Sequence, residues 1–296
     1  MELQLKIEQS FDILIQRRGA IGDVVMTTGV VRELKKRYGA NANIDVATDF
    51  AEVYRNNPHV RNIFPVDQIP AASNWQLYIN LDDAYELNPE NHYVDNYFYR
   101  AFGSTEFDKS VELFPTNEDC AGILNFQTEN ELTTYIVVHM RNWAWGAKNI
   151  SMDVWLDVFV KLFEVRTDFK IVCVGGTSDH YLDHPLLVDA RAKFTSQQLK
   201  FLCNGARAFV GIDSGPFQCA AASNTPIVAL LTHLNPERIM PFGSRTDTAI
   251  PTLEDCRGCN DRQRRPVRQI VCAKSTYPCI SNFDTGKIAK AVLELL

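Results

Sequence analysis

Four of the eight cysteines in this sequence lie within 24 residues of one another, near the end of the chain. A pair separated by two residues leads the group, and thiolates in such an arrangement suit tetrahedral coordination of zinc or iron. Spacing alone does not distinguish the two metals, and four unlinked thiols are the structural alternative. The candidate ligands are Cys256, Cys259, Cys272 and Cys279.

A second candidate site lies where the apolar run 11–17 ends and the glycines Gly19 and Gly22 precede Asp23. Ligands bind at the carboxyl ends of strands in an open parallel sheet, and glycines permit close approach of the backbone there. The spacing is not that of the GxGxxG dinucleotide-binding motif. Asp23 is therefore either a carboxylate of a ligand-binding edge or the N-cap of the helix that follows.

Two further motifs follow strand-like runs in the second half of the chain. The segment 213–216, Asp-Ser-Gly-Pro, opens a helix of small residues, and free N–H groups at a helix start suit a phosphate. Arg141 and Lys148 lie in a loop after another apolar run, where a lysine can neutralise a phosphate. The structural alternatives are a capped helix and a solvated lysine. His139 ends the same run at the edge of the expected cleft and could assist there, but as one histidine among six it is interpreted as structural.

The elements that must position these residues alternate between strand-like and helical periodicity, as in parallel sheets covered by helices. The polar stretch 125–134 is the best candidate for a linker, so we expect two doubly wound α/β domains with a cleft between them. Strands are expected at 11–17, 43–49, 60–66, 75–81, 134–140, 170–176, 207–213 and 225–231, and helices at 23–39, 151–166, 195–205, 214–223 and 283–296.

The composition excludes several classes of protein. A formal charge of −6 argues against a dominant nucleic-acid-binding surface. No apolar run reaches the roughly 18 residues of a membrane span, and charges interrupt the N-terminal run, so no signal peptide is expected. We expect a cytoplasmic protein with reduced thiols, and peripheral association with the inner membrane is the alternative.

Taken together, the motifs resemble those of glycosyltransferase family 9, the ADP-heptose:lipopolysaccharide heptosyltransferases. The resemblance lies in 18–38, in Lys148 and in 213–230, where Asp-Ser-Gly-Pro is followed by an alanine-rich helix and Thr-Pro-Ile-Val-Ala-Leu. It implies the GT-B fold, with the acceptor on the first Rossmann-like domain and the nucleotide sugar on the second. The expected domains are 1–130, 131–282 and a C-terminal helix, 283–296, that returns to the first domain.

The resemblance also implies an inverting transfer of a sugar, heptose from ADP-heptose, to a hydroxyl of a glycan or protein without a catalytic metal. Asp23 would be the general base, and Lys148 would stabilise the leaving diphosphate. The other implied site residues are Asp213, Ser214, Gly215, Pro216, Gln218 and Arg141 on the donor side, with Arg18, Gly19 and Gly22 on the acceptor side.

The sequence departs from the family pattern at two motif positions, and the segment 67–125, where the acceptor would bind, matches no part of that pattern. Gln218 begins the run where a histidine is usual, and Asp179 lies a residue or two from the expected acidic position. Two alternatives stay open: transfer from another nucleotide sugar to a glycan, a protein or a modified base, and a non-catalytic protein that binds sugar nucleotides. The segment 256–279 is similar to the four-cysteine segment of bacterial autotransporter heptosyltransferases, which implies a structural iron, with zinc as the alternative.

Overall fold

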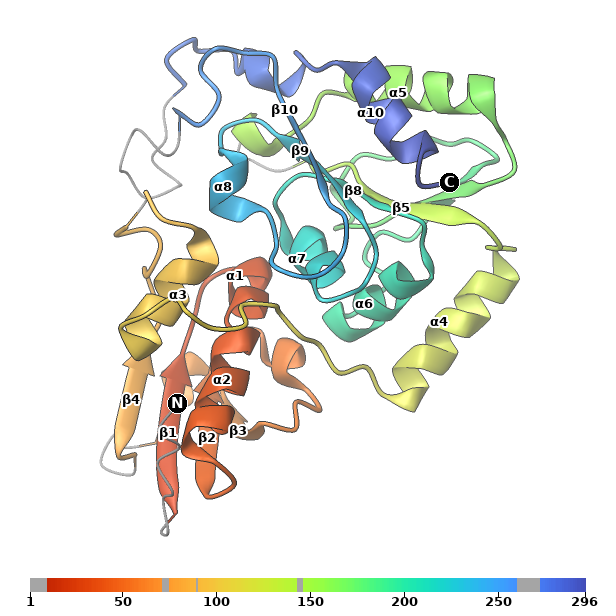
Figure 1. The fold of residues 1–296 in the computed structure, drawn as a ribbon. Coiled ribbons are helices and arrows are strands. Elements are labelled where there is room, and N and C mark those ends of the chain that lie inside the picture. The colour runs from red at the N-terminus through yellow and green to blue at the C-terminus, as the bar shows by residue number, and fades with distance from the viewer. Residues whose placement is uncertain (1–9, 71–74, 89, 143–145, 260–271) are drawn as a thin grey trace.

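The computed structural model describes residues 10–70, 75–88, 90–142, 146–259 and 272–296. These residues form two β-sheets with their own helices, which meet where α1 and α7 lie side by side (Figure 1). The strand pairs of both sheets are parallel. The predicted α/β class with two facing Rossmann-like domains is confirmed.

The first sheet has the strand order β3-β2-β1-β4. β1 is central because its apolar residues Ile13, Leu14 and Ile15 are buried on both faces, as is typical of an inner parallel strand. The carboxyl ends of β1 and β4 therefore open onto the same edge. The elements here are β1 (Phe11–Gln16), β2 (Ala42–Ala47), β3 (Val60–Phe64), β4 (Leu77–Asn80), α1 (Ile21–Met26), α2 (Thr28–Tyr38), α3 (Tyr93–Phe102), η1 (Ala51–Tyr54) and η2 (Val66–Gln68).

The helix predicted over 23–39 is divided at Thr27 into α1 and α2. The hydroxyl of Thr27 donates to the carbonyl oxygen of Val24 at 2.7 Å, and that of Thr28 donates to Val25 at 2.8 Å. Such bonds compete with the regular helical ladder and change the direction of the chain. The short first helix carries Asp23 and points toward the second domain.

The second sheet has the order β10-β9-β8-β5-β6-β7. β5 pairs with both β6 and β8, so the strand order reverses there and a crevice opens at the carboxyl ends of β5 and β8. The elements are β5 (Tyr135–His139), β6 (Lys170–Cys173), β7 (Leu187–Asp189), β8 (Phe209–Gly211), β9 (Ile227–Leu231), β10 (Thr248–Pro251), α4 (Asn117–Glu129), α5 (Met152–Val165), α6 (Ser196–Gly205), α7 (Gly215–Ala221), α8 (Pro236–Ile239), α10 (Thr285–Leu293), η4 (Gly146–Lys148) and η6 (Pro278–Ile280).

The connection between the domains differs from the predicted linker, because α4 is helical through Glu129 and packs on α6. The Phe126 ring contacts Phe194 edge to face with centroids 5.0 Å apart, and Gln127 Nε2 donates to the Tyr135 hydroxyl at 2.7 Å. The helix α4 therefore lies against the second domain, although the predicted bound at residue 130 assigned it to the first. The exact domain bounds stay a prediction.

The resemblance implied that the C-terminal helix returns to the first domain, but α10 does not. It packs on α5 and beside β9 and β10 (Figure 1). The reason is its apolar face, where Ile288 and Val292 are fully buried in the cluster that also holds Trp155 and Phe159 of α5. Burial of this face stabilises the helix on the second domain.

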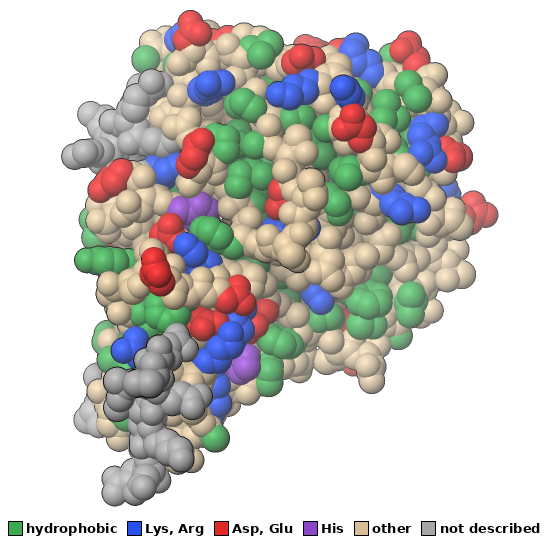
Figure 2. Space-filling model, in the orientation of Figure 1, with side chains coloured by type: hydrophobic (Ala, Val, Ile, Leu, Met, Phe, Trp, Pro, Cys, Tyr) green, Lys and Arg blue, Asp and Glu red, His purple; other side chains and the backbone are tan. Residues whose placement is uncertain are grey.

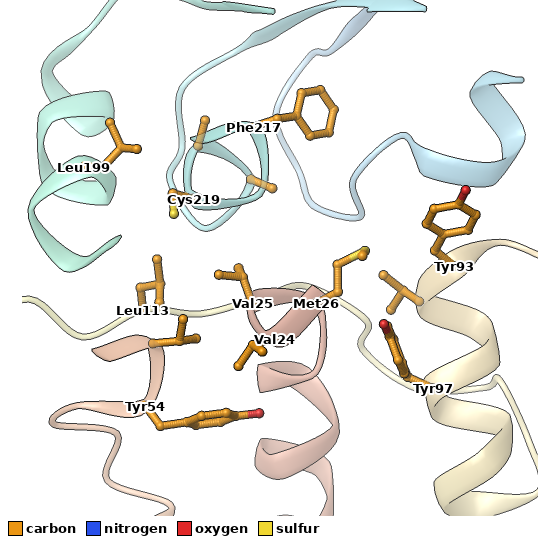
Figure 3. Packing of buried hydrophobic residues seen from close by; sticks show 14 of the residues in the cluster. Val24, Val25, Met26, Tyr54, Tyr93, Tyr97, Leu113, Leu199, Phe217 and Cys219 are labelled. Atoms are coloured by element: carbon orange, nitrogen blue, oxygen red, sulfur yellow. The ribbon is translucent and has the colours of Figure 1, made fainter. Parts of the chain in front are cut away.

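A single apolar cluster passes from the first domain to the second. Val25 and Met26 of α1 face α7, where Phe217 and Cys219 are buried, whereas Val24 points toward Tyr54 (Figure 3). On the outer surface, Lys and Arg side chains are interspersed with Asp and Glu over the visible face (Figure 2). Within the described part of the chain, no helix has the length and apolar character that crossing a membrane requires.

Candidate active site in the interdomain cleft

A cavity of about 1310 Å³ lies between the two domains. Its first wall comes from α1 and the loops after β1, β2 and β4, and its second wall comes from the carboxyl ends of β5, β6 and β8. Gln218 lies just behind the second wall and is buried. The predicted site residues that line the cavity are Arg18, Gly19, Gly22, Asp23, Arg141, Lys148, Asp213, Ser214, Gly215 and Pro216.

Asp23 reaches this cavity from the first turn of α1, with 17% of its side chain exposed. Its Oδ2 accepts a hydrogen bond from the Ala20 backbone N–H at 3.0 Å, which caps the helix start. Its Oδ1 accepts from the Tyr85 hydroxyl at 3.1 Å. The prediction of Asp23 as the N-cap is therefore wrong, because Ala20 is the N-cap and Asp23 is the third residue of α1. From that position the same carboxylate bonds the N-cap N–H and borders the cavity.

Sequence reasoning missed the residues that hold Asp23. Arg17 is only 3% exposed, and its Nη2 lies 3.2 Å from Asp23 Oδ2 and 2.9 Å from Glu86 Oε1. The guanidinium also lies over the Tyr85 and Tyr97 rings, 5.4 and 5.3 Å from their centroids. Burial raises the pKa of Glu86 above its usual range even though Arg17 opposes the shift. The available signal was a charged residue directly after a buried strand.

The second wall holds a buried ion pair. Lys148 Nζ lies 2.6 Å from Asp213 Oδ2, with side-chain exposures of 11% and 9%. Gln218 Nε2 donates to Asp213 Oδ1 at 3.2 Å, and Arg141 Nη1 donates to the Asp213 carbonyl oxygen at 3.3 Å. Burial alone would raise the pKa of Asp213, but Lys148, Gln218 and Arg141 together hold it below its usual range. The carboxylate is therefore ionised and fixes the ammonium group at the cavity.

Gly215 lets the two walls approach each other. A Cβ at this position would overlap the Cγ2 atom of Ile21, and a Cβ at Gly22 would lie 3.3 Å from the Ser214 carbonyl oxygen. Both glycines sit where α1 and α7 meet. Close contact of the helices keeps Asp23 and Ser214 on opposite sides of one cavity.

Gly215→Ala is expected to destabilise the protein by about 1–3 kcal/mol, because the added methyl group overpacks the contact between α1 and α7. The measurement is the free energy of unfolding by denaturant. Gly122→Ala is the matched control, since its Cβ would meet Gln198 Nε2 at an ordinary 3.6 Å. Equal stability of the Gly215→Ala variant and the wild type would show that the contact is not tight.

The four cysteines lie close enough to influence one another. Cys279 in η6 is 6% exposed, and burial raises its pKa to about 12, with further contributions from Cys259, Cys256 and Cys272. Among the residues that the structure describes, no group of three or more His, Cys, Asp or Glu has the geometry of a metal site. The donor chemistry suits a soft or borderline metal, but its coordination stays a prediction. The segment 260–271 between two of the cysteines lies outside the described residues.

Two facing Rossmann-like domains around a cleft that holds a carboxylate on one wall and a lysine on the other define a GT-B-like fold. Residues 183–266 match the family model described as glycosyltransferase family 9 (heptosyltransferase). This segment contains Asp213, Ser214 and the whole of α7. A comparison of the sequence with curated proteins gives no match.

Several solved structures with a similar fold are described as glycosyltransferases. One is a family 9 glycosyltransferase from Veillonella parvula DSM 2008, with TM-score 0.75, 17% identity and coverage of 98% of each chain. Another is E. coli ADP-heptose LPS heptosyltransferase II, with TM-score 0.70, 15% identity and coverage of 96% of this chain and 98% of that one. The iron-containing dodecameric glycosyltransferase TibC from enterotoxigenic E. coli H10407 gives TM-score 0.70, 14% identity and coverage of 98% and 79%. The family match and the fold together indicate a glycosyltransferase.

Proposed function

We propose that this protein is an inverting glycosyltransferase that transfers a heptose from ADP-heptose to a hydroxyl group of a glycan or a protein. The observation that carries this proposal is the position of Asp23 and of the Lys148–Asp213 pair on opposite walls of one cavity. An inverting transfer requires one base on the acceptor side and one stabilised leaving group on the donor side. The cavity supplies both kinds of group.

In the proposed reaction, Asp23 accepts the proton of the acceptor hydroxyl while the oxygen of that hydroxyl forms a bond to the anomeric carbon. The bond from that carbon to the diphosphate oxygen breaks at the same time, and the leaving ADP keeps the electron pair. Lys148 and Arg141 stabilise the charge that develops on this oxygen. We assign Asp213, Ser214, Gly215, Pro216 and Gln218 to donor binding, with Arg18, Gly19 and Gly22 on the acceptor side.

An assay of ADP release from ADP-heptose by the purified protein, with glycan and peptide acceptors, tests the proposal. Acceptor-dependent release of ADP supports it. Release of a nucleoside diphosphate from a different nucleotide sugar supports the alternative donor. Gln218 favours this alternative, because its amide donates to Asp213 at a position where the resembled family usually has a histidine. Tight binding of a nucleotide sugar without turnover on any acceptor would indicate a non-catalytic binding protein.

We also propose that Cys256, Cys259, Cys272 and Cys279 hold a structural iron, with zinc as the alternative. TibC, which has a similar fold, is described as iron-containing. A metal bound to these thiolates would fix the segment 256–279 against the second domain. The end of this segment enters η6, which contacts η4, the turn that carries Lys148. A reducing cytoplasmic location, free or peripheral at the inner membrane, would keep the thiols available as ligands.

Cys256→Ser is expected to reduce the bound metal from about one ion per chain to a small fraction, because a tetrahedral site loses one of its four ligands. Metal analysis of the purified protein measures the loss, and visible absorbance distinguishes an iron–thiolate centre from colourless zinc. Cys120→Ser is the control, since Cys120 lies in α4, outside the segment. Metal-free wild type, or unchanged metal content in Cys256→Ser, would contradict the assignment.

A further inference from the structure

Three side chains from separate elements form a hydrogen-bonded chain in the second wall of the cavity. His139 ends β5, Asp179 lies in the loop after β6, and Ser214 is the N-cap of α7. His139 Nε2 lies 3.0 Å from Asp179 Oδ2, and His139 Nδ1 lies 2.9 Å from Ser214 Oγ. All three residues line the cavity, although His139 is only 3% exposed. We call this chain of side chains the 139 relay.

The partners of Asp179 determine the direction of the first hydrogen bond. Its carboxylate accepts from the Gly176 N–H at 2.7 Å and from the Asn142 N–H at 2.7 Å. Burial alone would raise the pKa of Asp179, but His139 and these two backbone donors outweigh that effect and hold the pKa below its usual range. The carboxylate is therefore ionised. An ionised carboxylate only accepts hydrogen bonds. His139 Nε2 must therefore carry a proton.

The state of Nδ1 then determines where the Ser214 hydroxyl points. In the neutral imidazole Nδ1 is an acceptor, so Ser214 donates its proton to His139 while its oxygen accepts the Phe217 N–H at 3.3 Å. In the protonated imidazole Nδ1 is a donor, so the Ser214 oxygen accepts from Nδ1–H and the Ser214 hydroxyl no longer donates to His139. The hydroxyl can then donate into the cavity instead.

A glycine makes room for the relay. Gly175 has φ of +129°, a conformation that other residues rarely adopt. A Cβ there would overlap the Asp179 carboxylate and lie 2.7 Å from His139 Cδ2. The packing therefore depends on the absence of a side chain at position 175, which indicates that the imidazole and carboxylate have a closely defined place.

The charged groups around the relay favour an anion in the cavity near Ser214. Arg141 and Lys148 come from the segment after β5 and line the same cavity. Other charged groups on the neighbouring elements include Asp213 after β8 and Arg191 after β7, which donates to the Asp179 carbonyl oxygen. On the facing domain the cavity is lined by Arg17, Arg18, Asp23, Asp49, Glu52, Asp82, Asp83 and Glu86. A bound diphosphate would add negative charge close to the imidazole and stabilise its protonated form.

We propose that His139 is a positioning residue that takes up a proton from solvent when a nucleotide-linked diphosphate binds, and so turns the Ser214 hydroxyl toward a phosphate oxygen. This inference rests on the proposed donor site and adds a proton to its binding step. On binding, the solvent proton goes to Nδ1, Nδ1–H donates to Ser214 Oγ, and Oγ–H donates to the phosphate. No other bond is made or broken.

Calorimetric titration with ADP-ribose tests the coupling, because this diphosphate diester has no group of its own that titrates near neutral pH. Titrations at pH 7 in PIPES and in Tris, whose ionisation enthalpies differ, give the number of protons taken up. We expect proton uptake by the wild type, with affinity about fivefold weaker at pH 8 than at pH 6.5. His139→Gln is expected to lose both the uptake and the pH dependence. His184→Gln, which changes an exposed histidine stacked on Phe163, is expected to keep both.

Nitrogen-15 NMR of the histidine rings of the wild type tests the relay without a ligand. A neutral His139 with its proton on Nε2 supports the hydrogen-bond directions, and a proton on Nδ1 overturns them. ADP-ribose binding without proton uptake, or equal uptake by His139→Gln, overturns the coupling alone. Absence of ADP-ribose binding by the wild type overturns the proposed donor site together with the coupling.

Discussion

Asp23→Asn is expected to lower the rate of sugar transfer by about 10²–10⁴-fold, because an amide cannot accept the proton of the acceptor hydroxyl. The substitution keeps the size of the side chain and an oxygen that can accept from Tyr85. The affinity for ADP-ribose is expected to stay close to that of the wild type, since Asp23 lies on the wall opposite Lys148 and Asp213. Initial rates of ADP release and calorimetry measure the two effects.

Asp119→Asn is a matched control for this experiment. Asp119 occupies the corresponding position of α4, where its Oδ2 accepts from the Thr116 backbone N–H at 2.9 Å, outside the cavity. It therefore reproduces the loss of a cap without touching the proposed site. Normal turnover by Asp23→Asn would reject the base assignment, and an equal loss in Asp119→Asn would assign the effect to helix capping.

Lys148→Ala is expected to weaken the binding of ADP-ribose, slow transfer and lower the free energy of unfolding by about 3–5 kcal/mol. The stability is lost because the Asp213 carboxylate stays buried without its 2.6 Å partner. Denaturant unfolding, calorimetry and initial rates measure the three effects. The double variant Lys148→Ala/Asp213→Asn should recover stability but not donor binding. Lys161→Ala removes an exposed ion pair with Asp157 and should change little.

The stability difference should also depend on pH. In the wild type the folded-state pKa of Asp213 is depressed, so its contribution is present at neutral pH and is lost only as pH falls through that low value. In Lys148→Ala the ammonium group that lowers the pKa of Asp213 is absent, so burial raises this pKa and favours protonation of Asp213 in the folded state. The difference between variant and wild type should therefore shrink from pH 7 to pH 5. An unchanged difference would show that Asp213 does not cause the loss.

The sequence predicted the parts of the molecule whose signals are local. β1, β5 and β9 are buried runs of apolar residues that a local pattern predicts. Asp23, Lys148 and Asp213 follow strands of this kind. Because ligands bind at the carboxyl ends of parallel strands, these three residues were expected at a ligand site, and they line one cavity. β7 and β10 were not predicted, because they are short and carry no long apolar run. These two strands are defined by pairing with β6 and β9.

The supporting residues of the site were missed for a different reason. His139 was interpreted as structural because it is one histidine among six. Its partners Asp179 and Ser214 lie 40 and 75 residues away in the sequence. Arg17 likewise meets Glu86, 69 residues away. Hydrogen bonds between such distant residues depend on the three-dimensional arrangement of several elements, and no local pattern of residue types reports them.

The apolar cluster shared by α1 and α7 constrains how this enzyme can move. Rotation of one lobe about a hinge would expose Val25 and Phe217 to water, at a cost of about 25 cal/mol for each Å² of apolar surface. The gap between Asp23 and Lys148 is therefore held by the protein before any ligand arrives. In the proposed transfer, little of the energy of donor binding would be needed to bring the lobes together, and it would remain available for aligning the anomeric carbon with the incoming oxygen.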